Sequence, residues 1–212
     1  MTYPLDAEII AIQSALEDLS PKHVAIFSAA CSERLLPIYE AFVTEERWGD
    51  FASLQNSLEL VWRSFVESAI QPAQLERQVV IIQQLTPDLN AFDSVVSALA
   101  VDVCICIDSA LRSLATESAV VNASEYALNA IRKAECVKAT GCLDLGDTVE
   151  AMQFENDAMS ITSVQHELEA QKTDLRRLER CNKLTGEAVG DFLADARANK
   201  VDSNELLRGL VR

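Results

Sequence analysis

The sequence has few basic residues, and this shortage excludes several kinds of partner. Its 212 residues include 18 Lys and Arg against 33 Asp and Glu, which gives a formal net charge of −15 at pH 7. A negative field of this size repels the phosphates of nucleic acids and the headgroups of anionic membranes. We therefore expect a protein that binds neither nucleic acids nor membrane surfaces.

Glycine and proline are also scarce, with 6 and 5 residues. An all-β protein would need more turn residues than this, whereas the abundant Ala, Leu, Glu and Gln favour helices. The first ten residues contain acids where a signal peptide needs bases. The most apolar stretch, Val95–Leu111, contains Asp102 and Asp108 and is shorter than the ~20 residues of a membrane span. We expect a soluble, cytoplasmic, all-α protein.

Side chains that build common catalytic or metal sites are few. The only histidines are His23 and His166, and the six cysteines form no C-x-x-C motif. Zinc and di-iron sites are therefore disfavoured, and no phosphate-binding loop or nucleophile elbow occurs. Cys31 or Cys104 could pair with His23 as a catalytic dyad, but we favour buried thiols and a solvent-facing histidine. We expect no metal and no cofactor.

Apolar residues recur with helical spacing along nearly the whole chain. The pattern predicts one all-helical domain over residues 1–212, a bundle of about seven to nine helices. A central helix at about 94–114 is apolar almost all round, which is typical of a buried helix. Pro37 lies inside a predicted helix and should kink or break it near Leu36. The helices of residues 147–212 are more polar.

The most uneven charge distribution lies between Lys138 and Lys172, where no Lys or Arg occurs. The seven acids in this segment are Asp144, Asp147, Glu150, Glu155, Asp157, Glu167 and Glu169. Asp144, Asp147 and Glu150 have a spacing that could hold a metal ion, but Asp147 and Glu150 also suit the start of a helix, which we favour. The segment predicts a site for a basic protein, formed by Asp144, Asp147, Glu150, Glu155 and Asp157.

Asp102 is the most unusual single residue, because it lies in the middle of the apolar helix. A bare buried carboxylate costs several kcal/mol, so Asp102 must be paired, hydrogen-bonded or protonated. Arg34 and Arg63 are candidate partners beside apolar stripes. One interpretation is an active-site acid. The one we favour is a buried ion pair with an arginine that fixes the register of two helices.

Several short motifs resemble a bacterial family catalogued as domain of unknown function 416. Glu33, Arg34, Pro37, Tyr39 and Phe42 fit its pattern E-R-x-x-P-x-Y-x-x-F. Further matches are Trp48-Gly49-Asp50, Leu85-Thr86-Pro87-Asp88, Phe92-Asp93 and the A-x-D-x-C pattern that ends at Cys104. The resemblance covers about residues 15–145 and, more weakly, the C-terminal helices. It implies an all-helical protein with no established activity, in which Glu33, Arg34 and Asp102 belong together.

These observations favour a non-enzymatic binding protein. By analogy of type, small acidic helical proteins resemble the immunity proteins that neutralise bacterial toxins, and a basic toxin such as a nuclease would suit this charge. One alternative is a small-molecule enzyme whose helix-lined pocket contains Asp102, Glu33 and Cys104. The other is a structural helical homodimer.

Overall fold

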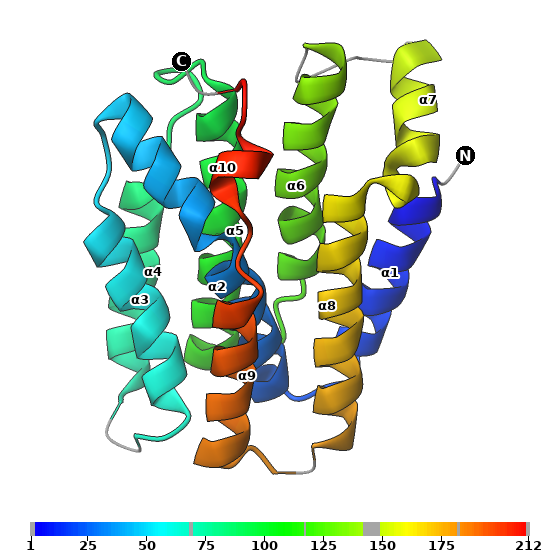
Figure 1. Cartoon of the computed structure of the whole chain (residues 1–212). Helices are drawn as coiled ribbons and strands as arrows, with labels where there is room; N and C mark the ends of the chain where they lie inside the picture. Colours follow the sequence, from blue (N-terminus) through cyan, green and yellow to red (C-terminus); the bar gives the residue numbers. More distant parts are fainter. Residues whose placement is uncertain (1–2, 68–69, 117, 142–148, 182, 211–212) are drawn as a thin grey trace.

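Every regular element in the described part of the chain is a helix, so the all-α prediction is confirmed (Figure 1). The computed structural model describes residues 3–67, 70–116, 118–141, 149–181 and 183–210, except for the side chains of residues 149–151. In chain order the elements are α1 (Pro4–Glu17), α2 (Pro21–Glu46), α3 (Phe51–Ser64), α4 (Pro72–Leu85), α5 (Val95–Ala115), α6 (Ala123–Thr140), α7 (Val149–Asp157), the 3-10 turn η1 (Ala158–Ser160), α8 (Thr162–Arg180), α9 (Gly186–Ala198) and α10 (Ser203–Leu206). The described residues thus form ten α-helices, one more than the upper end of the predicted seven to nine.

Two helices, and not one, occupy the centre of the bundle. The predicted apolar helix is α5, and it packs against α2, α4 and α6. Its largest contact is with α2, in which every residue from Val24 to Leu36 is buried. Small side chains such as Ala25, Ala29 and Ser32 allow neighbouring helices to approach closely on several sides of α2. Because neighbouring helices cover α2 on several sides, α2 is a second central helix beside α5.

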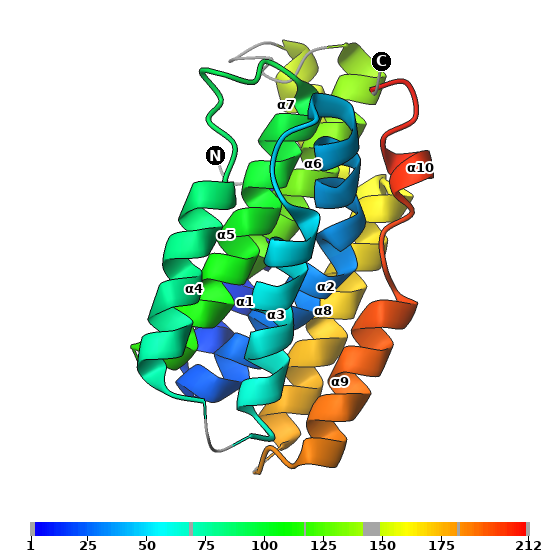
Figure 2. The same ribbon diagram turned by 90° about the vertical axis from the view of Figure 1, so that its left-hand side faces the viewer.

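The other helices surround this central pair in two groups. Figures 1 and 2 show α3 and α4 on one side, and α1, α6 and α8 on the other. The C-terminal helix α9 packs along α2, and the short α10 contacts α2 and α6. One continuous apolar core runs from Leu5 in α1 to Leu207 after α10. No helix in the described ranges is long and apolar enough to cross a membrane.

Pro37 does not end its helix, so of the two predicted outcomes, a kink or a break near Leu36, the break does not occur. The helix α2 continues from Pro21 to Glu46 with Pro37 inside it. Proline removes one intrahelical hydrogen bond and crowds the preceding turn, and the burial of residues on both sides offsets that cost. The carbonyl of Arg34, in that preceding turn, accepts a hydrogen bond of 2.9 Å from the backbone N–H of Val201. The proline turn of α2 is therefore where the segment after α9 attaches.

The turn between α2 and α3 requires a glycine, and this yields a stability prediction. Asp50 caps α3 as predicted, and Gly49 before it has a φ of +91°. A β-carbon on Gly49 would lie 2.9 Å from the hydroxyl oxygen of Tyr39. Gly49→Ala is expected to lower the free energy of unfolding, measured in urea, by about 1–3 kcal/mol. Gly190→Ala is the matched control, because Gly190 lies in α9 with open space around it and should gain about 0.5–1 kcal/mol.

Candidate functional site

The most concentrated polar cluster is buried and centres on Arg34 of α2, which is 2% exposed. Its Nε and Nη2 donate to the two carboxylate oxygens of Glu167 in α8, at 2.8 and 2.9 Å. Its Nη1 donates to Oδ2 of Asp174 at 2.8 Å, and Nη2 also reaches the sulfur of Cys31 at 3.5 Å. One guanidinium therefore joins two carboxylates of α8 to α2.

Gln171 and Ser124 extend this cluster to α6. Gln171 Nε2 donates to Glu167 at 3.0 Å and to the carbonyl of Ser124 at 3.2 Å, and the Ser124 hydroxyl donates to Gln171 Oε1 at 2.7 Å. Glu167, Gln171 and Asp174 are four and three residues apart, so they share one face of α8. We call Arg34, Glu167, Gln171, Asp174 and Ser124 the Arg34 cluster.

The Arg34 cluster has more negative than positive charge. Glu167 and Asp174 share one guanidinium, and both carboxylates are nearly inaccessible, at 2% and 5% exposure. Burial raises the pKa of Asp174 above its ordinary value, and the attraction of Arg34 offsets only part of that rise. Burial also raises the pKa of the Cys31 thiol, so this thiol stays protonated and uncharged beside Arg34.

Glu33, the neighbour of Arg34, holds the C-terminal segment. Its carboxylate is 2% exposed, and Oε1 accepts from Arg197 Nε at 3.0 Å and pairs with Lys200 Nζ at 3.3 Å. Arg197 also reaches Glu59 of α3 at 3.3 Å. Together with the backbone bond from Val201 to Arg34, these contacts fasten the chain after α9 to the proline turn of α2.

Asp102 is buried and paired, but its partner is Lys133 of α6. The Lys133 ammonium donates to both carboxylate oxygens, at 3.0 and 2.8 Å. The predicted pairing of Asp102 with Arg34 is wrong, because Arg34 contacts α8 whereas Asp102 contacts α6. Burial raises the pKa of Asp102 to about 6, against the lowering effect of Lys133. Because Lys133 donates to both oxygens, this ion pair satisfies the buried carboxylate of Asp102 and links α5 to α6.

The predicted acidic patch lies only partly within the described residues. Asp144 and Asp147 lie outside them, and Glu150 begins α7 but its side chain is not described. Glu155 forms an ion pair with Arg132 of α6, so a local base compensates its charge. Asp157 is exposed and accepts a hydrogen bond of 2.6 Å from Gln153. The binding role of these five residues stays a prediction.

The contacts of the cysteines and of His23 do not form a catalytic dyad. His23 is half-buried and not solvent-facing as predicted; its ring lies 2.6 Å from the Ser20 hydroxyl and 2.8 Å from the carbonyl of Cys181. Because a carbonyl only accepts, Nε2 carries the proton, and His23 links α2 to the end of α8. Cys31 contacts Arg34 instead, and burial raises the pKa of Cys104 to about 12. Both thiols are poor nucleophiles.

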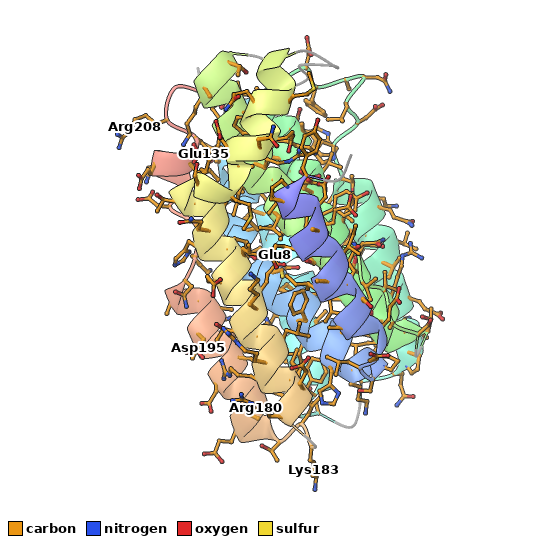
Figure 3. All side chains as sticks on the ribbon, turned by 90° about the vertical axis from the view of Figure 1, so that its right-hand side faces the viewer. Glu8, Glu135, Arg180, Lys183, Asp195 and Arg208 are labelled. Carbon is orange, nitrogen blue, oxygen red and sulfur yellow. The ribbon has the colours of Figure 1, made fainter. Side chains whose placement is uncertain are left out.

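Two hollows lie along α8 and reach the Arg34 cluster. The larger, about 520 Å³, lies between α6, α8 and the segment before α10, and Glu167 and Lys200 line it. The smaller, about 250 Å³, lies between α8 and α9, and Arg34 and Asp174 line it. His166 lines both. Figure 3 shows this side of the molecule, with α8 between α1 and α9 and Asp195 on α9.

Comparison with known proteins places the chain in a family. The model of the family described as "Protein of unknown function (DUF416)" matches residues 11–204. The chain belongs to the DUF416 family. The crystal structure of a DUF416 family protein from Shewanella baltica has the same fold, with a TM-score of 0.73 and 24% identity; the match covers 87% of this chain and 92% of that one. An uncharacterized protein of Haemophilus influenzae is 26% identical over 174 residues, which is 81% of this chain and 84% of the relative.

The residues that carried the resemblance to DUF416 hold the bundle together. Glu33 and Arg34 bind the C-terminal helices, the Tyr39 hydroxyl donates to the carbonyl of Leu85 at 2.8 Å, and Phe42 contacts the ring of Trp48. Glu33, Arg34 and Asp102 are all buried, but they form three separate contacts with three different regions. The expectation that they belong together is therefore corrected.

Sequence reasoning missed the acids that bind Arg34. Glu167 was predicted only as part of the acid run, and no role was predicted for Asp174. A signal was present, because both acids lie on the stripe of α8 that carries Leu168, Leu175 and Leu178, all buried. Acids on an apolar stripe indicate a buried cation, as did Asp102 in α5.

Proposed function

We propose that this DUF416 protein is a non-enzymatic, cytoplasmic binding protein that neutralises a basic protein partner, in the manner of a bacterial immunity protein. The observation that carries the proposal is an uneven distribution of charge between the two ends of the helical bundle. Acids that no described base compensates gather at the end where α2 and α4 finish. The helices α6 and α7, which the first residues of the predicted acid run connect in the chain, also meet at this end.

The acidic end consists of Glu46, Asp50, Asp88 and Asp93, from the α2–α3 turn and the loop before α5. The rings of Phe42, Trp48 and Phe92 pack edge-on or tilted against one another and hold these two segments together, with centroids 5.1–5.9 Å apart. No ion pair reaches the four acids from any residue in the described ranges. Arg47 is the base within the turn itself.

A basic partner would relieve an unfavourable arrangement at the acidic end. The last turn of α2 contains Glu45 and Glu46 and no basic residue, although a helix C-terminus favours cations. Leu89, in the same loop as Asp88, is 52% exposed and adds apolar contact area. Carboxylates around an exposed apolar residue suit a protein surface that combines lysine or arginine with apolar side chains.

The helices that flank the predicted acidic patch in the chain also reach this end of the bundle. Figure 1 shows that α6 ends and α7 begins at the same end of the bundle, and Asp144 and Asp147 lie between these helices in the chain. At the opposite end, α8 finishes with Arg176, Arg177 and Arg180, and Figure 3 shows Arg180 and Lys183 there. An electric field of this polarity would orient a basic partner and raise its association rate, typically by 10–10³-fold.

Charge reversal tests the surface. The triple variant Glu46→Lys, Asp88→Lys, Asp93→Lys is expected to lose a basic partner that the wild type captures from extracts of its own organism. With the purified partner, the association rate should fall at least about tenfold and lose most of its salt dependence. The matched control is Glu76→Lys, Glu179→Lys, Glu187→Lys, which reverses three exposed acids elsewhere. Capture of the same partner by both variants, with unchanged salt dependence, would contradict the proposal.

A second variant set and a growth assay separate binding from neutralisation. Reversal of Asp144, Asp147, Glu150 and Asp157 tests the predicted patch and leaves out Glu155, because Glu155 pairs with Arg132. Each variant is then expressed together with the captured partner. Growth should be rescued by the wild type and by the control, but not by a variant that has lost binding. A partner that is not toxic would limit the function to binding.

A further inference from the structure

The groove between α8 and α9 places the Arg34 cluster within reach of a small molecule. Both helices pack on α2, and the hollow of about 250 Å³ between them has Arg34 and Asp174 as buried lining residues. Arg177 of α8 and Asp195 of α9 form an ion pair across it. The walls include Ala170, so the groove combines a charged floor with small apolar side chains.

Asp174 has one carboxylate oxygen without a hydrogen bond. Its Oδ2 accepts from Arg34 Nη1 at 2.8 Å, but Oδ1 accepts from no residue in the described parts of the chain. The side chain is 8% exposed, and Asp174 lines the groove, so this oxygen is not sealed in the core. A buried carboxylate with a free oxygen in a hollow is a position for a ligand's hydrogen-bond donor.

The charge around the groove determines which kind of hydrogen-bond donor a ligand must carry to bind there. Four carboxylates lie at or directly behind the groove: Glu167, Glu169, Asp174 and Asp195. Glu169 also pairs with Lys172 and Arg176. The other three carboxylates face the two guanidiniums of Arg34 and Arg177, which leaves one formal negative charge. Arg177 is already committed, because it pairs with Asp195 and stacks on the ring of Phe192 at 4.2 Å. Ligand cations would therefore be attracted and ligand anions repelled.

We propose that this groove binds a small organic cation, a primary ammonium or guanidinium group on a short aliphatic chain, with Asp174 as its buried counter-ion. The cation donates to Asp174 Oδ1, while Arg34 continues to hold Oδ2. A volume of about 250 Å³ lies below the range of about 300–1,000 Å³ typical of drug-sized ligands, so the ligand is compact. The aliphatic part lies against Ala170 and Ala196.

The site predicts a direction for the pH dependence of binding. Because burial raises the pKa of Asp174, a proton competes with the ligand for this carboxylate, and binding weakens as pH falls through that raised pKa. Arg34, Glu167 and Arg177 also face Asp174, and His166 lines the groove. A His166→Gln variant tests whether the pH dependence of binding persists without this histidine.

Calorimetric titration with agmatine and with putrescine tests the proposal on the full chain, and butane-1,4-diol is the uncharged comparison. The wild type should bind at least one of the two amines at millimolar concentration or better, and at least about tenfold more tightly than the diol. Asp174→Asn keeps the shape of the side chain and should weaken amine binding at least about tenfold. Glu179→Gln, an exposed acid on the same helix, should leave binding unchanged.

Each alternative result overturns the proposal. Equal affinity of Asp174→Asn and wild type would show that the amine binds elsewhere. Binding of the diol as strong as that of the amines would show an apolar hollow without charge selection. Absence of amine binding to the wild type at millimolar concentration would exclude the ligand class. The unfolding transition of Asp174→Asn is measured alongside, and a variant that does not fold is replaced by Asp174→Ser for the same comparison.

Discussion

Arg34→Met is expected to lower the free energy of unfolding by about 3–5 kcal/mol, measured by urea denaturation at neutral pH. The substitution keeps most of the aliphatic volume but removes the guanidinium that holds Glu167 and Asp174. Two carboxylates would then be buried without a counter-charge, and each would have to take up a proton or draw in water. The loss should shrink at acidic pH, where protonation removes this cost.

Two comparisons identify the cause of that loss. Arg63→Met removes an ion pair with Glu67 whose side chains are 50% and 43% exposed, and should cost less than about 1 kcal/mol. The triple variant Arg34→Met, Glu167→Met, Asp174→Leu removes the whole buried charge set and should recover most of the loss, because apolar packing replaces buried ion pairs at little cost. A triple variant less stable than Arg34→Met would contradict this account.

Asp102→Asn is expected to change the pH dependence of stability by about 3 kcal/mol. Burial raises the pKa of Asp102 from 3.8 to about 6 in the folded protein. Between these values the folded state binds a proton more tightly than the unfolded chain, so the wild type loses stability as pH rises. Asparagine does not titrate. The free energy of unfolding of Asp102→Asn minus that of the wild type should therefore increase by about 3 kcal/mol from pH about 4 to pH about 7.

A matched substitution on the same helix controls for the loss of an ion pair. Asp108 of α5 pairs with Arg112, and its side chain is 24% exposed. Asp108→Asn should lower the free energy of unfolding by less than about 1 kcal/mol, since solvent screens that pair. Stability curves of Asp102→Asn and wild type that run parallel over this pH range would show that the folded state does not raise the pKa of Asp102.

Much of the fold could be predicted because the evidence for it is local. The spacing of apolar residues predicted most helices, and the observed caps, Asp50 before α3 and Gly141 after α6, are residue types that favour helix ends. The apolar helix α5 was placed to within one residue at each end. The exception was Pro37, where a local rule predicted a kink or a break and the helix does not break. Packing around α2 and the bond from Val201 to the Arg34 carbonyl keep the helix continuous, and neither is a property of nearby sequence.

The candidate sites were less predictable, because an ion pair depends on which faces of distant helices meet. Asp102 was correctly expected to be buried and paired, since a carboxylate in an apolar helix has few other options. Its partner could not be chosen from the sequence, because Arg34, Arg63 and Lys133 all lie near apolar positions. In the folded protein Asp102 forms an ion pair with Lys133, and Arg34 forms ion pairs with the acids of α8.

The sequence by itself determined that this DUF416 protein is helical, that it carries an excess of acid, and that Arg34 and Asp102 cannot be ordinary surface residues. These properties follow from composition and from spacing within single helices. Only the tertiary structure decided that Arg34 joins two carboxylates of α8 and that Asp174, one of these two, lines the groove beside α9. It also decided that acids without an ion pair among the described residues gather at one end of the bundle. Contacts between different helices and loops decide these features, and helical periodicity contains no information about them.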